Sequence, residues 1–267
     1  MKKTTLKDLR NDSKYVNALV LKGNTKLLDY DDNENNDFIR YAQFSTRALK
    51  DCPFKSAGCT IACYATKGLH NFPSVKENRK AAKLASENPN FAENMIFTIE
   101  TEFKSARYAG KHMMLRLHES GDFYSVEYLE KWIDVFTHFL KNRENHFTTC
   151  FYTKSFEYFL SIDDSKAAVI NECLDNNIVA MSFSIDDTTS TEQIARLAKC
   201  MMRFPKANIY YCTENVESVK RDSECDCANC AKCAKCTKTS GKTVAVKIHS
   251  VNEKELAQYH KNAMKKH

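Results

Sequence analysis

Cysteine is the residue type in this sequence whose number and spacing most clearly indicate chemistry. The chain has 267 residues and 12 cysteines. A first group consists of Cys52, Cys59 and Cys63, on a segment that also contains Pro53 and Gly58. Three thiolates are one short of the four that hold a complete [4Fe-4S] cluster. The fourth iron would then be open to a small molecule or held by a distant residue.

A second and denser group lies near the C-terminus. Its members are Cys225, Cys227, Cys230, Cys233 and Cys236. The last four follow one another with two residues between, close to the cysteine run of bacterial ferredoxins. Zinc sites normally separate two Cys-x2-Cys pairs by a longer spacer, so iron–sulfur is favoured and zinc is the alternative. The eight thiols could serve two clusters, or the first group could borrow one ligand from the second.

The remaining cysteines and the overall composition bear on the compartment. No apolar leader and no apolar run of about 18 residues is found, so we expect a cytoplasmic protein with no membrane segment. Disulfides are disfavoured in that reducing compartment, and clustered thiols there indicate metal or catalysis. The net charge of +6 permits nucleic-acid contact without arguing for it. We expect four cysteines to pack in the core: Cys150, Cys173, Cys200 and Cys212.

Polar residues that follow predicted strands form a second set of candidates. His118, Glu119 and Asp122 share one strand-to-helix turn, which could supply a general base, metal contacts and backbone N–H donors. Lys154 ends the next strand and could bind a carboxylate or phosphate. We expect these four to be catalytic. The alternative is that Asp122 or Ser125 only caps the following helix and that Lys154 is an exposed lysine.

These residues need a scaffold that brings strand ends together. Apolar runs predict strands at 38–49, 113–117, 148–152, 178–185, 208–212 and 244–248. Helical periodicity predicts helices at 74–86, 90–108, 126–140, 165–176 and 191–202, with capping boxes at 74–77 and 190–193. The alternation predicts an α/β fold, a partial or distorted (β/α) barrel of about six mostly parallel strands with Cys-rich metal-binding loops. An open doubly wound sheet is the alternative. In both folds functional groups gather at the carboxyl ends of the strands.

The sequence pattern also divides the chain into three parts. Residues 1–37 are read as a polar N-terminal arm. Residues 38–250 form the α/β domain and include the Cys-rich segment 222–240. Residues 251–267 are read as a basic C-terminal tail or helix.

Several of these segments together resemble the phage "gene product 88" family. The matching pieces are Cys52-Pro53 with Cys59 and Cys63-Tyr64-Ala65, residues 116–125, Phe151-Tyr152-Thr153-Lys154-Ser155, the late Cys-x2-Cys-x2-Cys run and His249. They cover residues 40–250 in order. The resemblance implies a phage or prophage origin and a host-cell cytoplasm as the compartment, but it does not imply an activity.

A more distant resemblance is to the radical S-adenosylmethionine (SAM) enzymes. These place a three-cysteine loop after the first strand of a partial barrel, with an aromatic residue near the last cysteine. The spacing here is x6 and x3, where that family has x3 and x2. The resemblance implies a [4Fe-4S] cluster and SAM as cofactors. We expect cofactor contacts from Tyr64, Ser120, Gly121 and Ser184.

Two functions follow from these observations. The first is a radical-SAM-like redox enzyme that acts on an unidentified small-molecule or macromolecular substrate. The second is a non-catalytic, metal-stabilised phage protein that binds nucleic acid or a host protein, with its cysteine loops as folding staples.

Overall fold

One sheet organises the chain. The computed structural model describes residues 4–22, 29–32, 37–142, 146–213, 223–224, 241–247 and 252–264. The strands of the sheet lie in the order β1-β2-β3-β4-β5-β6-β8-β7. They are β1 (Tyr30–Asp32), β2 (Asp37–Phe44), β3 (His112–Leu117), β4 (Phe147–Thr153), β5 (Val179–Asp186), β6 (Asn208–Thr213), β7 (Ser223–Glu224) and β8 (Thr243–Lys247). β1 pairs with β2 antiparallel, and all the other pairings are parallel.

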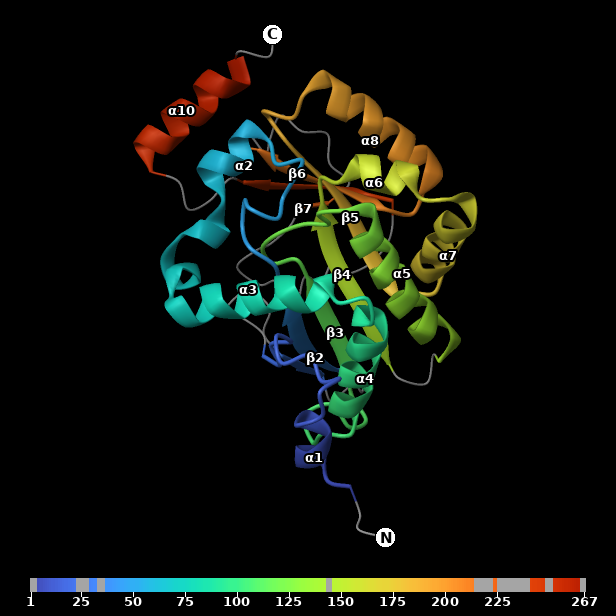
Figure 1. Cartoon of the computed structure of the whole chain (residues 1–267). Helices are drawn as coiled ribbons and strands as arrows, with labels where there is room; N and C mark the ends of the chain where they lie inside the picture. Colours follow the sequence, from blue (N-terminus) through green and yellow to red (C-terminus); the bar gives the residue numbers. More distant parts are fainter. Residues whose placement is uncertain are drawn as a thin grey trace.

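Most of the helices lie in the connections between successive strands, whereas the first precedes β1 and the last follows β8 (Figure 1). The α-helices are α1 (Leu6–Arg10), α2 (Ala57–Ala62), α3 (Pro73–Glu87), α4 (Phe91–Phe103), α5 (Val126–Lys141), α6 (Phe156–Ser161), α7 (Asp164–Asp175), α8 (Thr191–Arg203) and α10 (Glu253–Met264). Two 3-10 helices, η1 (Tyr64–Thr66) and η2 (Gly68–Asn71), follow α2. The five predicted helices are α3, α4, α5, α7 and α8, with boundaries shifted by a few residues.

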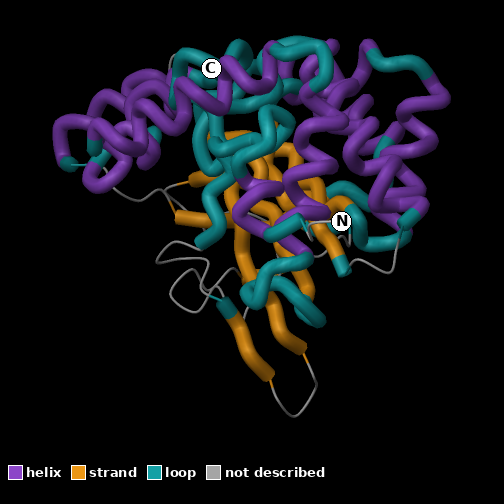
Figure 2. Tube along the Cα trace, turned by 60° about the horizontal axis from the view of Figure 1, so that its bottom comes forward, coloured by secondary structure: helices purple, strands orange, loops and turns teal. Residues whose placement is uncertain are grey.

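The predicted partial barrel is confirmed as a curled, mostly parallel sheet that forms half of a barrel. β2, β3, β4, β5, β6 and β8 are neighbours in chain order, which a doubly wound sheet would not give. Crossovers of one hand between consecutive neighbours bring the connecting helices to the same side. Figure 2 shows the helices gathered on one side of the sheet. The late Cys-rich loop, residues 225–236, lies outside the described residues.

The two faces of the sheet differ in what covers them. On the helix side, Phe44, Leu115 and Phe183 belong to the main apolar core. On the other side, Tyr41 and Met114 belong to a much smaller cluster that also includes Cys150 and Ala180. Adjacent side chains along a strand point to opposite faces, so this division follows from the alternation within each strand.

The N-terminal residues contribute to the core. Val16 and Leu19 are 6% exposed, and Val20 forms a β-bridge with Gln43. β1 extends the sheet beyond β2. Residues 4–22 and 29–32 of the predicted arm are therefore packed against the α/β domain.

One of the two predicted helix caps is present in the structure and the other is not. The capping box predicted at 74–77 is wrong, because Pro73 takes the first helical position of α3 and Phe72 becomes its N-cap. Ser190 caps α8 as expected, since its hydroxyl accepts from the Gln193 N–H at 3.2 Å. α2 was not predicted. Among the described residues, no helix combines the length and the hydropathy that crossing a membrane requires.

Candidate functional site

The first cysteine group lies directly after the first parallel strand. Ser56 caps α2 by accepting a hydrogen bond from the Cys59 N–H at 3.0 Å. Cys59 lies within α2, Cys52 precedes the helix and Cys63 ends it. All three thiols are partly buried. This placement, a three-cysteine loop after the first strand of a half barrel, is the one that the sequence predicted.

The carboxyl end of β5 contacts this loop. The Ser56 hydroxyl donates a hydrogen bond to the Asp186 carboxylate, and the Cys59 Sγ lies 3.8 Å from Asp186 Oδ2. The Gly58 N–H donates to Thr188 Oγ1 at 2.7 Å. Residues 130 positions apart in the sequence are thus joined at the carboxyl edge of the sheet.

A buried ion pair supports this junction. Lys154 Nζ lies 2.9 Å from Asp186 Oδ2, and the two side chains are 12% and 4% exposed. Burial works against the charged form of each group. The nearby Cys59 and Asp186 nevertheless raise the pKa of Lys154 to about 12. Lys154 and hydrogen bonds from Ser56 and Thr188 hold the pKa of Asp186 at about 2. Both groups are therefore charged at neutral pH.

The thiols influence one another. Burial raises the pKa of Cys52, and Asp122, Cys63 and Cys59 raise it further through their negative charge. Burial also raises the pKa of Cys63, with a further contribution from Cys59. Burial and the neighbouring negative charges therefore disfavour the thiolate forms of Cys52 and Cys63.

Cys212, at the end of β6, faces the same edge. Burial raises the pKa of Cys212 to about 12; Lys154 opposes this shift, while Asp186 and Cys59 add to it. The thiol is partly buried, whereas the other three cysteines predicted to lie in the core are fully buried, as expected. Cys212 therefore belongs to the surroundings of Cys59 more than to the core.

Asp122 ties two strand ends to the cysteine loop. Its carboxylate accepts from Thr153 Oγ1 at 2.7 Å and from the Lys154 N–H at 2.9 Å. Its own N–H donates to the Asp51 carbonyl at 3.0 Å, directly before Cys52. Burial raises the pKa of Asp122 to about 6, although these hydrogen bonds oppose the shift. Ser125, and not Asp122, caps α5.

The other predicted residues of this turn have different surroundings. His118 is 4% exposed, and its Nε2 lies 3.0 Å from the Tyr128 hydroxyl. Its ring packs edge-on against Phe123, so it contributes to the aromatic core. The Tyr64 hydroxyl donates to the Glu119 carbonyl at 2.6 Å, which joins the end of the cysteine loop to the β3 turn.

Ser120 and Gly121 make the closest approach to the loop after β2. Ser120 Oγ donates to the Thr46 carbonyl at 2.6 Å, and the Thr46 N–H donates to the Ser120 carbonyl at 3.1 Å. Ser184 takes part through its carbonyl, which accepts from Lys154 Nζ at 3.3 Å. All predicted residues in the described part of the chain therefore lie at or beside one edge of the sheet.

Comparison with known proteins adds the family. The family model described as Gene product 88 matches residues 18–239. The chain belongs to the Gene product 88 family. No curated protein and no solved structure matches it significantly. The matched range spans both cysteine groups of this Gene product 88 chain and all the strands from β1 to β7.

Three features of this Gene product 88 chain escaped sequence reasoning. The first is the contact of Asp186 and Thr188 with α2. The second is a row of side chains on the face of the sheet away from the helices. There the Arg116 guanidinium lies 4.5 Å from the Tyr152 ring centre, and the rings of Tyr152 and Tyr210 are 4.5 Å apart. The third is the contact of α10 with α2. A polar residue at a strand end is a usable signal for the first feature, but no local pattern indicates the other two.

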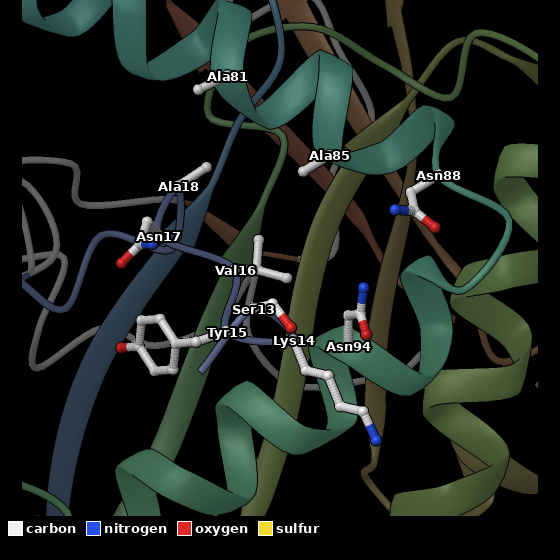
Figure 3. Close-up of a pocket in the computed structure, with 10 residues that line it drawn as sticks. All are labelled: Ser13, Lys14, Tyr15, Val16, Asn17, Ala18, Ala81, Ala85, Asn88 and Asn94. Atoms are coloured by element: carbon white, nitrogen blue, oxygen red, sulfur yellow. The ribbon is translucent and has the colours of Figure 1, made fainter. Parts of the chain in front are cut away.

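The structure also has a hollow of about 250 Å³ on the N-terminal side of the molecule (Figure 3). Its lining comes from the N-terminal segment, α3 and α4. The lining residues are Ser13, Lys14, Tyr15, Val16, Asn17, Ala18, Ala81, Ala85, Asn88 and Asn94. Lys14 is the only ionisable side chain among them besides Tyr15, and none of the predicted site residues takes part.

The predicted metal ligands lie partly inside and partly outside the ranges that the structure describes. Within the described ranges, no three His, Cys, Asp or Glu side chains form a group able to hold a single metal ion. The second cysteine group, Cys225 to Cys236, lies outside those ranges, as does His249. The ligand assignment of all eight cysteines therefore remains a prediction.

Proposed function

We propose that the chain is an iron–sulfur enzyme of the radical-SAM type, with a [4Fe-4S] cluster held by Cys52, Cys59 and Cys63. One observation carries the proposal: the three-cysteine loop follows the first strand of a parallel half barrel and lies against the carboxyl ends of the later strands. Enzymes with parallel α/β sheets place their chemistry at this edge. Such a cluster, with one iron open, would bind SAM and supply the electron for its reductive cleavage.

The character of the donor set supports a bound metal centre. Burial and neighbouring negative charge disfavour the thiolate forms of Cys52 and Cys63, and a bound cationic centre would favour them. The Lys154 ammonium interacts electrostatically with Cys59 and offsets part of the negative charge. Zinc remains the alternative metal, and the second cysteine group could hold a further cluster.

The chain's own residues have distinct tasks in this proposal. Asp186 anchors α2 through Ser56 and lies against Cys59. Asp122 fixes the β4 end relative to the residue before Cys52. Tyr64 joins the end of the cysteine loop to the β3 turn, where Glu119 is partly exposed and could contact a substrate or cofactor.

The test is anaerobic purification with iron, sulfide and zinc counted per chain, followed by dithionite and SAM. We expect a brown protein that forms 5′-deoxyadenosine. A triple Cys52/Cys59/Cys63→Ser variant should lose that product and about four irons per chain, whereas a Cys173→Ala variant should keep both. Cys173 is the matched control because it is buried away from the site.

Two outcomes would refute the enzyme. A colourless chain that carries zinc or free thiols would remove the cluster. A brown chain that yields no 5′-deoxyadenosine would remove the radical-SAM reaction. Steeply salt-dependent nucleic-acid binding by such a chain would then favour the metal-stabilised binding protein.

A further inference from the structure

We propose that Tyr259, on the C-terminal helix α10, is a positioning residue that holds the cysteine helix α2 against the strand ends. Its purpose, to keep Cys59 in place for the cluster, rests on the function proposed above. The contact itself is a property of the fold. It joins residues that are separated by 201 positions in the sequence, Gly58 and Tyr259.

Gly58 is the point at which α2 and α10 meet. A methyl group at this position would lie 2.5 Å from the Tyr259 ring and 2.9 Å from Thr188 Oγ1. Both distances are shorter than real side-chain carbons allow. Because Gly58 has no side chain, the Tyr259 ring and the Thr188 hydroxyl can both lie directly against the backbone of α2.

Tyr259 is itself firmly held. Its side chain is 1% exposed. Its hydroxyl accepts a hydrogen bond from the Asp187 N–H at 3.1 Å and lies 3.3 Å from Asp187 Oδ2. One turn earlier on α10, Glu255 pairs with Lys67 at 2.7 Å. Figure 1 shows α10 lying beside α2 at the end of the sheet where the cysteine loop sits.

The cysteine helix depends on such support. α2 has six residues, and isolated helices of that length are not stable in water. Cys59 follows Gly58 directly, so any displacement of α2 moves its thiol away from Asp186. The Tyr259 ring and the Thr188 hydroxyl both lie against α2 at Gly58, and Ser56 and Cys59 of the same segment lie against Asp186.

Gly58→Ala should change the melting temperature in opposite directions depending on whether α2 is packed against Tyr259 and Thr188 or is an ordinary exposed helix. In an ordinary helix this change stabilises, because alanine has the higher helix propensity. Here we expect a lower melting temperature and alkylation of Cys59 by iodoacetamide about tenfold faster relative to Cys63, since the methyl group forces α2 away from its support. Ala57→Ser, on the exposed side of α2, is the control and should change neither quantity.

A second variant tests the partner. Tyr259→Leu removes the ring edge that the methyl group would strike. In the double variant Gly58→Ala/Tyr259→Leu, iodoacetamide should therefore alkylate Cys59 more slowly than the combined effects of the two single substitutions predict. Normal Cys59 reactivity and a raised melting temperature in Gly58→Ala, or strict additivity in the double variant, would overturn the inference.

The alkylation measurement uses the iron-free chain and needs no cluster. An iron-free wild type would therefore refute the proposed function and leave the positioning role of Tyr259 open to test. If the wild type does bind iron, Gly58→Ala should lower the iron content per chain. Unchanged iron together with unchanged alkylation would refute the positioning role alone.

Discussion

Buried ionisable side chains at the ends of β3, β4 and β5 respond to burial in different ways. Lys154 and Asp186 remain charged because they pair with each other. Burial lowers the pKa of His118 to about 3, so it is neutral at pH 7. The pKa of Asp122 shifts in the opposite direction, since burial raises it to about 6. Each shift makes the stability of the fold depend on pH.

His118 should make the fold less stable in mild acid. Its pKa is about 6.5 when unfolded and about 3 when folded, so between these values the unfolded chain binds the extra proton. The free energy of unfolding should therefore fall by about 2 kcal/mol from this residue between pH 7 and pH 5. Asp122 acts in the opposite direction between pH 6 and 3.8, because its folded pKa is the higher one.

The contribution of His118 is isolated by comparing wild type with His118→Asn in urea unfolding at pH 7 and pH 5. Asparagine is the suitable replacement because residue 118 has a φ of 58°, a conformation that asparagine tolerates. The stability difference between the two proteins should shrink by about 2 kcal/mol at the lower pH. A difference that does not change with pH would show that the imidazole is not kept neutral in the fold.

At the scale of elements, the loops after β2 and β3 lie unusually close together. Gly121 has a φ of 80°, in the left-handed region. A Cβ at this position would lie 1.9 Å from Thr46 Oγ1 and 3.0 Å from the Thr46 main chain. The β3 turn therefore requires glycine for its conformation and for the close contact with the loop that leads into the cysteines.

Gly121→Ala and Gly110→Ala separate these two requirements. Gly110 has a φ of 67°, but a Cβ there would meet nothing within 4 Å. We expect Gly110→Ala to lower the free energy of unfolding by about 1 kcal/mol, which is the cost of the left-handed conformation. Gly121→Ala should cost about 2 kcal/mol more through the clash with Thr46.

Thermal and urea unfolding of the two alanine variants measure this difference. Equal losses would mean that the loops can separate at little cost, and the tight contact between the β2 and β3 loops would not be needed.

For the whole molecule, the N-terminal segment is fastened by a charge inside the fold. The Glu102 side chain, on α4, has no exposed surface. It accepts from Arg10 Nε at 2.7 Å and from the Tyr15 hydroxyl at 2.7 Å. The Val16 N–H donates to Thr98 Oγ1, one turn earlier on the same helix. The N-terminal segment therefore behaves as part of the helical layer.

Glu102→Gln should release the N-terminal segment first. The amide nitrogen of glutamine cannot accept the hydrogen bond that Arg10 Nη2 donates to Glu102 Oε2, and the ion pair with Arg10 is lost, so we expect the free energy of unfolding to fall by about 2 kcal/mol. Limited proteolysis should then cut within residues 4–22 before it cuts the sheet. Glu100→Gln is the control, because Glu100 lies on the same helix, is 44% exposed and pairs with His138. Equal cleavage of the two variants would contradict the anchoring role.

Sequence reasoning reached the elements because their signals are local. Leu129, Ile133 and Phe136 recur at helical spacing and lie on the buried face of α5. Spacing and order along the chain were enough to predict the cysteine group after the first parallel strand and the half barrel. They also revealed the family resemblance. The local signal failed where two residues could begin the same helix: Pro73 took the first helical position of α3, so Ser74 is not its N-cap.

Tertiary structure alone decided what surrounds the cysteines. Asp186, Thr188 and Tyr259 reach α2 only because parallel strands in chain order collect their carboxyl ends at one edge, and because α10 returns to that edge. These contacts join segments more than a hundred residues apart. Their formation depends on the packing of the whole sheet and its helices, and no periodicity within a short stretch of sequence records it.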